Sequence, residues 1–204
     1  MDFSPDPEIG VWSTDRDCYE LLAQQCRPEA RTLETGSGLS TVLFAALGAQ
    51  HTCVTPSQAE ADRIMDYCNG HGIDVSALRF AIGGSDTVLP QRSEPIDILL
   101  IDGNHGFPAP ILDWYYGAQL LVDGGLLVLD DTQLPAVGEL VRFVEGDPRW
   151  ASVRRSDKWA AWRRRGSGTL AQDWFEQKWY SMPLPLHQRV VGKVRHEFGR
   201  LRGR

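Results

Sequence analysis

Short apolar runs alternate along this chain with segments whose apolar residues recur at helical spacing. The runs at 95–101 and 125–129 are apolar almost throughout, as in parallel strands buried on both faces. Further strands are expected within 31–38, at 51–54 and at 78–82, with helices at 39–47, 57–68 and 136–145 and another ending near 121. This alternation predicts an α/β fold with a doubly wound, mostly parallel, Rossmann-like sheet of seven strands.

An additional helix is expected before the first strand. Ser13 or Thr14 can cap it, and it should end near Gln25. Asp15 and Asp17 would lie in its first turn, where the helix dipole favours negative charge. We therefore expect residues 1–26 to form an N-terminal cap on a central domain of residues 27–166.

Tryptophan and arginine are concentrated towards the end of the chain. Five of the seven tryptophans lie at or beyond Trp150, and the Trp-Ala-Ala-Trp segment at 159–162 precedes three arginines. This pattern predicts a terminal antiparallel hairpin with a basic turn or edge. Its tryptophans either cover the sheet, since large aromatic side chains bury much apolar area, or form the wall of a substrate pocket.

A basic amphipathic helix is expected after Pro185. Its apolar residues, between 190 and 201, fall on one helical face among lysines and arginines. That face can pack on its own domain, pair with a second subunit in a homodimer, or contact an anionic surface. We assign residues 167–204 to an aromatic and basic C-terminal helical tail.

The amino-acid composition indicates the cellular compartment and the kind of binding partner to expect. The formal net charge of −6 disfavours a nucleic-acid partner and leaves a small-molecule substrate as the expectation. The four cysteines form no CxxC pair and no zinc-like spacing, which indicates reduced thiols. No signal peptide and no run of about 18 apolar residues is evident, so we expect a cytoplasmic protein without a membrane span.

Acidic residues follow directly on the two most apolar runs. Asp102 ends the first, with His105 three residues later, and Asp130 and Asp131 end the second. The carboxyl ends of parallel strands meet at one edge of a sheet, where ligands bind, so these side chains should converge. Crowded carboxylates repel unless a cation compensates them, and oxygen ligands suit Mg²⁺ or another hard divalent ion. Alternatively, Asp130 or Asp131 merely caps the next helix.

A glycine turn follows the first strand of the sheet. Gly36 and Gly38 allow close approach of a ligand to the backbone, but Thr41 stands where a dinucleotide-binding turn has its third glycine. Glu34, just before the turn, would repel a pyrophosphate and attract an ammonium group. The turn therefore indicates a cationic cofactor, the alternative being a tight turn without a ligand.

Four turns in this order resemble those of class I S-adenosylmethionine (SAM)-dependent methyltransferases. They are the Glu-x-Gly-x-Gly turn, the turn at 83–86, the Asp-Gly-x-His at 102–105 and the Asp-Asp at 130–131. The resemblance covers roughly 32–144 and is strongest to the metal-dependent O-methyltransferases of the catechol and macrocin types. It implies SAM as cofactor and Mg²⁺ as the metal.

The resemblance also implies roles for individual residues. Cofactor contacts would come from the first turn, the turn at 83–86 and the end of the 95–101 strand: Glu34, Gly36 and Gly38 at the methionine part, Ser40 at its carboxylate, Ser85 and Asp86 at the adenine, and Asp102. The metal ligands would be Asp102, Asp130 and Asp131. His105 occupies the position of a general base, and a neutral imidazole can accept a hydroxyl proton at neutral pH. His105 could instead be a further metal ligand or a passive loop residue.

One position departs from the family pattern. Related enzymes end the second strand in an acid that binds both ribose hydroxyls, whereas this chain has Thr55 there. Thr55 or Ser57 offers one hydroxyl, and a neutral hydrogen bond is about half as strong as a charge-assisted one. We therefore expect a weakened contact to the ribose.

Together these features predict Mg²⁺-assisted methyl transfer from SAM to a hydroxyl of a small phenolic, sugar or natural-product substrate. Two alternatives stay open. One is a metal-independent methyltransferase acting on nitrogen or a carboxylate. The other is a non-catalytic binding protein that keeps the fold, which the threonine at position 55 would suit.

Overall fold

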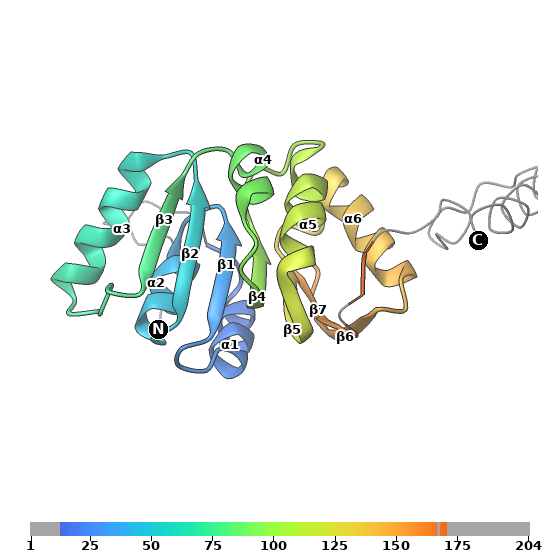
Figure 1. The fold of residues 1–204 in the computed structure, drawn as a ribbon, viewed down its shortest axis with the longest axis horizontal. Helices are drawn as coiled ribbons and strands as arrows, with labels where there is room; N and C mark the ends of the chain where they lie inside the picture. Colours follow the sequence, from blue (N-terminus) through green and yellow to red (C-terminus); the bar gives the residue numbers. More distant parts are fainter. Residues whose placement is uncertain (1–12, 167, 171–204) are drawn as a thin grey trace, which may run out of the picture.

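The computed structural model describes residues 13–166 and 168–170, and in them a single seven-stranded sheet (Figure 1). The strand order is β3-β2-β1-β4-β5-β7-β6, in which β1 to β5 run parallel to one another and β7 runs antiparallel to both of its neighbours, β5 and β6. The strands are β1 (Arg31–Thr35), β2 (Gln50–Thr55), β3 (Leu78–Ile82), β4 (Ile96–Ile101), β5 (Leu121–Leu129), β6 (Trp150–Arg155) and β7 (Ala160–Arg164). The expected mostly parallel α/β sheet and its terminal hairpin are confirmed.

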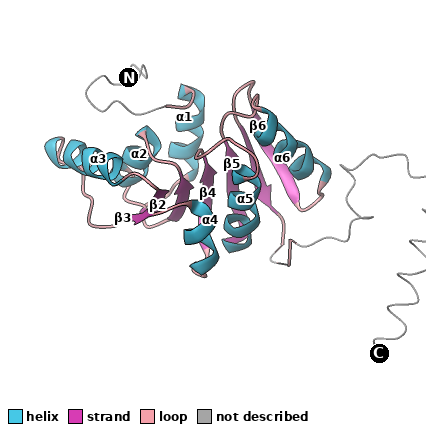
Figure 2. Ribbon diagram, turned by 90° about the horizontal axis from the view of Figure 1, so that it is seen from above, coloured by secondary structure: helices cyan, strands magenta, loops and turns pink. Residues whose placement is uncertain are grey.

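Helices cover both faces of the sheet, as Figure 2 shows from above. One face carries α1 (Arg16–Gln25), α2 (Leu39–Ala46) and α3 (Gln58–Gly70). The other carries the short α4 (Ser85–Val88) with a 3-10 turn (Leu89–Gln91), then α5 (Ala109–Leu120) and α6 (Pro135–Gly146). The two central strands, β4 and β5, are buried between these layers, which explains why their sequences are so apolar.

The tryptophans of the hairpin belong to the core. Trp159 is fully buried against the α1 and α2 side of the sheet, and Trp162 is buried against the α5 and α6 side. Successive strand residues face opposite sides, so this short segment anchors both layers. The interpretation that these aromatics cover the sheet is confirmed for Trp159 and Trp162, while Trp12, Trp174, Trp179 and the predicted terminal helix lie outside the described residues.

The arginines after Trp162 do not form a basic turn. Arg163 and Arg164 are part of β7, which is an inner strand, and the turn of the hairpin precedes them. Arg164 is buried and donates hydrogen bonds to the backbone carbonyls of Ala118 and Leu121 at the end of α5. The Arg164 guanidinium thus supplies hydrogen bonds to carbonyl groups at the end of the helix, which have no partner within the helix.

The start of α1 differs from the expectation. The N-cap is Asp15, whose side chain makes no capping hydrogen bond, and neither Ser13 nor Thr14 caps the helix. The Thr14 hydroxyl donates instead to Asp130 Oδ1 at 2.6 Å, and its backbone N–H donates to the hydroxyl of Tyr19 at 3.0 Å. The segment leading into α1 is therefore tied to the end of β5.

All four cysteines are free and buried. Burial raises the pKa of the Cys26 thiol to about 11, so it stays protonated at neutral pH. None of the described helices has the length and apolar composition needed to cross a bilayer.

Candidate functional site

A cavity of about 930 Å³ opens at the carboxyl ends of the parallel strands. Its walls come from the turns after β1, β2, β4 and β5, the start of α4 and the first turns of α5. This is the expected place for a ligand in an open α/β sheet. Of the residues singled out from the sequence, the cavity brings together Gly36, Thr55, Ser85, Asp86, Asp102, His105, Asp130 and Asp131.

Glu34, Gly38 and Ser40 are not part of the cavity lining. Glu34 is 1% exposed and accepts a hydrogen bond from the Thr41 hydroxyl, and its Oε1 lies 3.0 Å from His51 Nε2. The other ring nitrogen of His51 lies 2.7 Å from the Thr32 hydroxyl. Glu34 therefore belongs to a closed polar network behind the glycine turn, and its assignment to the cofactor stays a prediction.

Gly36 is required by the crossing of two backbones. Its φ is +90°, and a Cβ placed there would lie 2.1 Å from the carbonyl oxygen of Asp102. Gly103 packs against the same turn, with a hypothetical Cβ 3.2 Å from the Gly36 nitrogen. The glycine turn after β1 thus packs directly against the backbone of Asp102 and Gly103 after β4. This close backbone contact fixes the position of Asp102.

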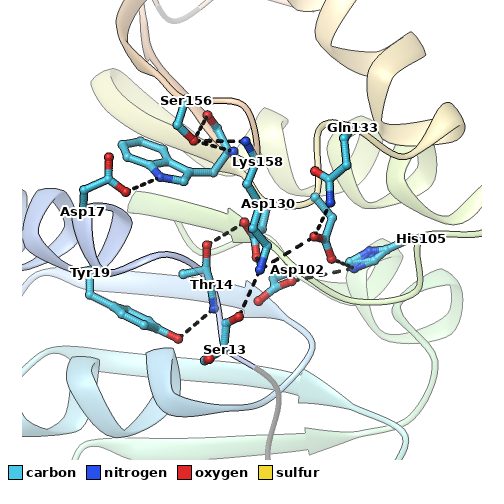
Figure 3. A network of polar contacts seen from close by, with 12 residues as sticks. Ser13, Thr14, Asp17, Tyr19, Asp102, His105, Asp130, Gln133, Ser156 and Lys158 are labelled. Atoms are coloured by element: carbon cyan, nitrogen blue, oxygen red, sulfur yellow. Dashed lines mark hydrogen bonds and ion pairs between the residues drawn. The ribbon is translucent and has the colours of Figure 1, made fainter. Parts of the chain in front are cut away.

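Two carboxylates and one imidazole form a compact group at the end of β4 and β5. One ligand atom each of Asp102, His105 and Asp131 lies within 4.8 Å of the others. His105 Nε2 is 3.2 Å from Asp131 Oδ2 and 3.7 Å from Asp102 Oδ1, and Figure 3 shows the ring facing Asp102. Burial, together with the nearby Asp130, Glu34 and Asp131, raises the pKa of Asp102 well above its usual value.

Asp130 is turned away from this group. Its Oδ1 accepts from Thr14, and its Oδ2 lies 3.8 Å from the Lys158 ammonium (Figure 3). Burial raises the pKa of Asp130, although Thr14 and Lys158 oppose that change. The expected trio of Asp102, Asp130 and Asp131 is thus gathered at one edge, but His105 replaces Asp130 in the compact group.

Lys158 is a member of the site that sequence reasoning missed. It comes from the turn between β6 and β7, donates to the Ser13 carbonyl at 3.0 Å, and lies 3.8 Å from Asp131 Oδ1 as well as from Asp130. Nothing in its sequence neighbourhood marks it, because the antiparallel hairpin brings it there across β7 and β5.

Glu60 is a second member that was missed. Its carboxylate lines the cavity beside Ser37 and Thr55, at the end of β2. A signal was present, since Ser57-x-x-Glu60 is the pattern of a helix-capping box and places Glu60 in the first turn of α3.

Asp113, a third missed residue, lies on α5 under the cavity wall. Its side chain is 1% exposed, and neither carboxylate oxygen has a hydrogen-bond partner among the described residues. The buried Thr35 hydroxyl also has no hydrogen-bond partner among the described residues. Burial raises the pKa of Asp113, while the nearby Ser85 and Thr35 hydroxyls lower it in part. Unpaired buried polar atoms at a cavity wall are typical of a site that a ligand completes.

Asp113→Asn is expected to raise the free energy of unfolding of the ligand-free protein by about 1 kcal/mol at pH 7.5, because it removes a buried charge without a partner. The pKa is raised in the folded state, so wild-type Asp113 takes up a proton as the pH falls. The difference in the free energy of unfolding between the wild type and Asp113→Asn should therefore shrink as the pH falls towards 3.8, the usual pKa of an aspartate. Urea unfolding across this range measures it. Asp66→Asn, at an exposed position of α3, is the control, and a loss of stability in Asp113→Asn at every pH would contradict the account.

The comparisons with known proteins agree with this architecture. Residues 33–132 match a family model described as a methyltransferase domain. A protein assigned as a caffeoyl-CoA O-methyltransferase from Staphylococcus aureus superposes with a TM-score of 0.64 at 16% identity, covering 76% of this chain and 86% of that one. The chain has a methyltransferase fold.

Further methyltransferase structures are also similar. The Podospora anserina methyltransferase PaMTH1, solved with bound S-adenosylhomocysteine (SAH), has a TM-score of 0.61 at 17% identity, covering 80% of this chain and 83% of that one. A protein assigned as an rRNA methylase from Clostridium thermocellum has a TM-score of 0.62 at 12% identity, covering 78% and 99%. The match to TrmN from Thermus thermophilus covers 47% of that chain. No curated protein sequence matches the chain.

Proposed function

We propose that this methyltransferase domain transfers a methyl group from SAM to a hydroxyl group of a small molecule. One observation carries the proposal: a single cavity joins the turns at Gly36 and Ser85 to the group formed by Asp102, His105 and Asp131. The side of the cavity at Gly36 and Ser85 suits a nucleoside cofactor, and the side at Asp102, His105 and Asp131 suits an acceptor with a hydroxyl group.

The cavity fits SAM in size and in polarity. Its volume of about 930 Å³ lies at the upper end of the range of about 300–1,000 Å³ that is usual for ligand sites. The unpaired oxygens of Asp113 and Thr35 offer hydrogen-bond acceptors and one hydroxyl at its wall. SAH bound to PaMTH1, a protein of the same fold, supports the choice of cofactor.

The acidic group fits a divalent cation. Asp102 and Asp131 would hold it as oxygen ligands, and Asp130 could add Oδ2, because its hydrogen bond from Thr14 uses Oδ1. When bound there, Mg²⁺ lowers the pKa of an acceptor hydroxyl that contacts it. Without a cation, the negative charge at this edge of the sheet is partly compensated by the Lys158 ammonium, which lies 3.8 Å from both Asp130 and Asp131.

His105 is the group that takes the proton. The His105 Nε2–H faces Asp131 Oδ2, 3.2 Å away, so Nδ1 is the nitrogen that accepts the acceptor's O–H proton, and Asp131 orients the ring and stabilises the imidazolium that forms. The freed oxygen lone pair forms a bond to the methyl carbon as the carbon–sulfur bond breaks, and its electrons stay on sulfur. The cationic sulfonium becomes the neutral thioether of SAH. Holding the two reactants in line is the main contribution of the cavity.

Removal of divalent cations tests the metal part of the proposal. EDTA is expected to abolish SAH formation with a panel of catechols and sugars, and added Mg²⁺ should restore it. Asp102→Asn should lower kcat about 100-fold or more, because it takes away a ligand of the cation. Calorimetric titration with Mg²⁺ in the presence of SAH should show one site in the wild type and none in Asp102→Asn.

Activity that survives both EDTA and Asp102→Asn would favour methyl transfer to nitrogen or a carboxylate without a metal. Cofactor binding without turnover on any acceptor would favour a non-catalytic binding protein. The net charge of −6 and the acidic group at the cavity support a small acceptor rather than RNA, although the similar structures include proteins assigned as rRNA methylases.

A further inference from the structure

A carboxylate reaches the end of β2 from the following helix. Strand β2 ends at Thr55, where the resemblance leads one to expect an acid. Glu60, in the first turn of α3, lines the same cavity, and its Oε2 accepts from Ser37 Oγ at 2.6 Å and lies 3.5 Å from Thr55 Oγ1. Ser37 belongs to the glycine turn after β1. The carboxylate is thus held between the turns that follow β1 and β2.

Local hydrogen bonding frees Glu60 for this position. In a capping box the N-cap side chain bonds the N3 backbone N–H, and the N3 glutamate bonds the N-cap N–H in return. Here Ser57 Oγ accepts from the Glu60 N–H at 3.2 Å, but the Ser57 N–H donates to Thr55 Oγ1, also at 3.2 Å. Thr55 therefore does the second half of the capping, and the Glu60 side chain is left to face the cavity.

The second carboxylate oxygen of Glu60 is available to a ligand. Both contacts of its side chain use Oε2, and Oε1 has no hydrogen-bond partner in the part of the chain that the structure describes. Within that part, Glu60 has no ion pair either. A carboxylate oxygen accepts hydrogen bonds, so the complementary ligand group is one with O–H or N–H donors, and a vicinal diol, with two O–H donors, meets this requirement.

We propose that Glu60 binds the ribose hydroxyls of the cofactor and so supplies, from α3, the carboxylate that Thr55 does not. Ser37 and Thr55 position it through their hydroxyls. The inference rests on the proposed function, because it takes an adenosine cofactor as the ligand of the cavity. It replaces the expectation of a weak ribose contact with that of a charge-assisted one.

Calorimetric titration of the full chain with SAH and with its 2′,3′-dideoxy analogue tests this assignment. Glu60→Gln is expected to weaken SAH binding about 10- to 100-fold, since a hydrogen bond to a charged group is lost. The same variant should change the affinity for the dideoxy analogue by less than about threefold, because that ligand has no ribose hydroxyls to lose. Glu60→Ala should show the same pattern.

Asp66→Asn is the matched control, because it removes one carboxylate from an exposed position of the same helix, and its affinity for both ligands should equal that of the wild type. Circular dichroism checks that every variant is folded. Equal SAH affinity in wild type and Glu60→Gln would overturn the inference, and so would an equal loss for both ligands, which would indicate a merely structural role. If the wild type binds no SAH at all, the proposed function itself fails.

Discussion

Replacing His105 with glutamine is expected to lower kcat by about 100- to 10,000-fold while leaving the affinity for SAH unchanged. Glutamine keeps a polar side chain of similar reach but cannot accept the proton of an acceptor hydroxyl. The ring contacts Asp102 and Asp131 and lies on the acidic side of the cavity, so the loss should fall on the reaction and not on cofactor binding. SAH release under saturating SAM measures kcat, and calorimetry measures the affinity.

His71→Gln serves as the control for this substitution. His71 follows α3, is exposed, and has its Nδ1 2.8 Å from the Tyr67 carbonyl, remote from the cavity lining. Its kcat should match the wild type. A His105→Gln protein that keeps a third or more of the wild-type kcat would show that His105 is not the proton acceptor. A parallel loss of Mg²⁺ affinity would instead make His105 a ligand of the cation.

Gly36→Ala is expected to lower the free energy of unfolding by about 3 kcal/mol or more and to abolish SAH binding. Two costs add up: the left-handed backbone at φ +90° and a Cβ only 2.1 Å from the Asp102 carbonyl oxygen. The second contact is with backbone, which cannot rotate away. Relief requires the ends of β1 and β4 to move apart, and the wall of the cavity would move with them. Urea unfolding and SAH calorimetry measure the two effects.

Gly48→Ala separates the two costs. Gly48 also has a positive φ, +71°, but a Cβ there would meet nothing within 4 Å. Only the backbone conformation is then disfavoured, and a loss of about 1 kcal/mol with normal SAH binding is expected. Similar losses in the two variants would mean that the crossing of the Gly36 turn with Asp102 does not set the geometry of the site.

The order of the elements was predictable because each depends on its own sequence. The apolar runs that became β4 and β5 fill both faces of a central strand, and the glycine at the end of α2 has the positive φ that ends a helix. The start of α1 was predicted wrongly. Thr14 is a good capping residue, but its hydroxyl is bound by Asp130, which lies far along the sequence, so a tertiary contact decides where the helix begins.

At the site, too, local sequence predicted some features, and tertiary contacts determined the others. The positions of Asp102, His105 and Asp131 followed from strand ends that meet at one edge of a parallel sheet. The directions in which the side chains point could not be predicted in this way. Glu34 stands at a strand end too, but strand alternation and the buried His51 turn its carboxylate away from the cavity. Lys158 reaches the acids because β7 runs antiparallel to β5 and so begins beside the end of β5, which no local pattern around Lys158 indicates.

The central claim is that the cavity at the strand ends binds an adenosine-based cofactor. Calorimetric titration of the full chain with SAH tests it most directly, since it requires neither a known acceptor nor turnover. The account predicts saturable binding of one SAH per chain, lost in Gly36→Ala and kept in His105→Gln. A wild-type protein that shows no heat of binding at millimolar SAH would contradict it.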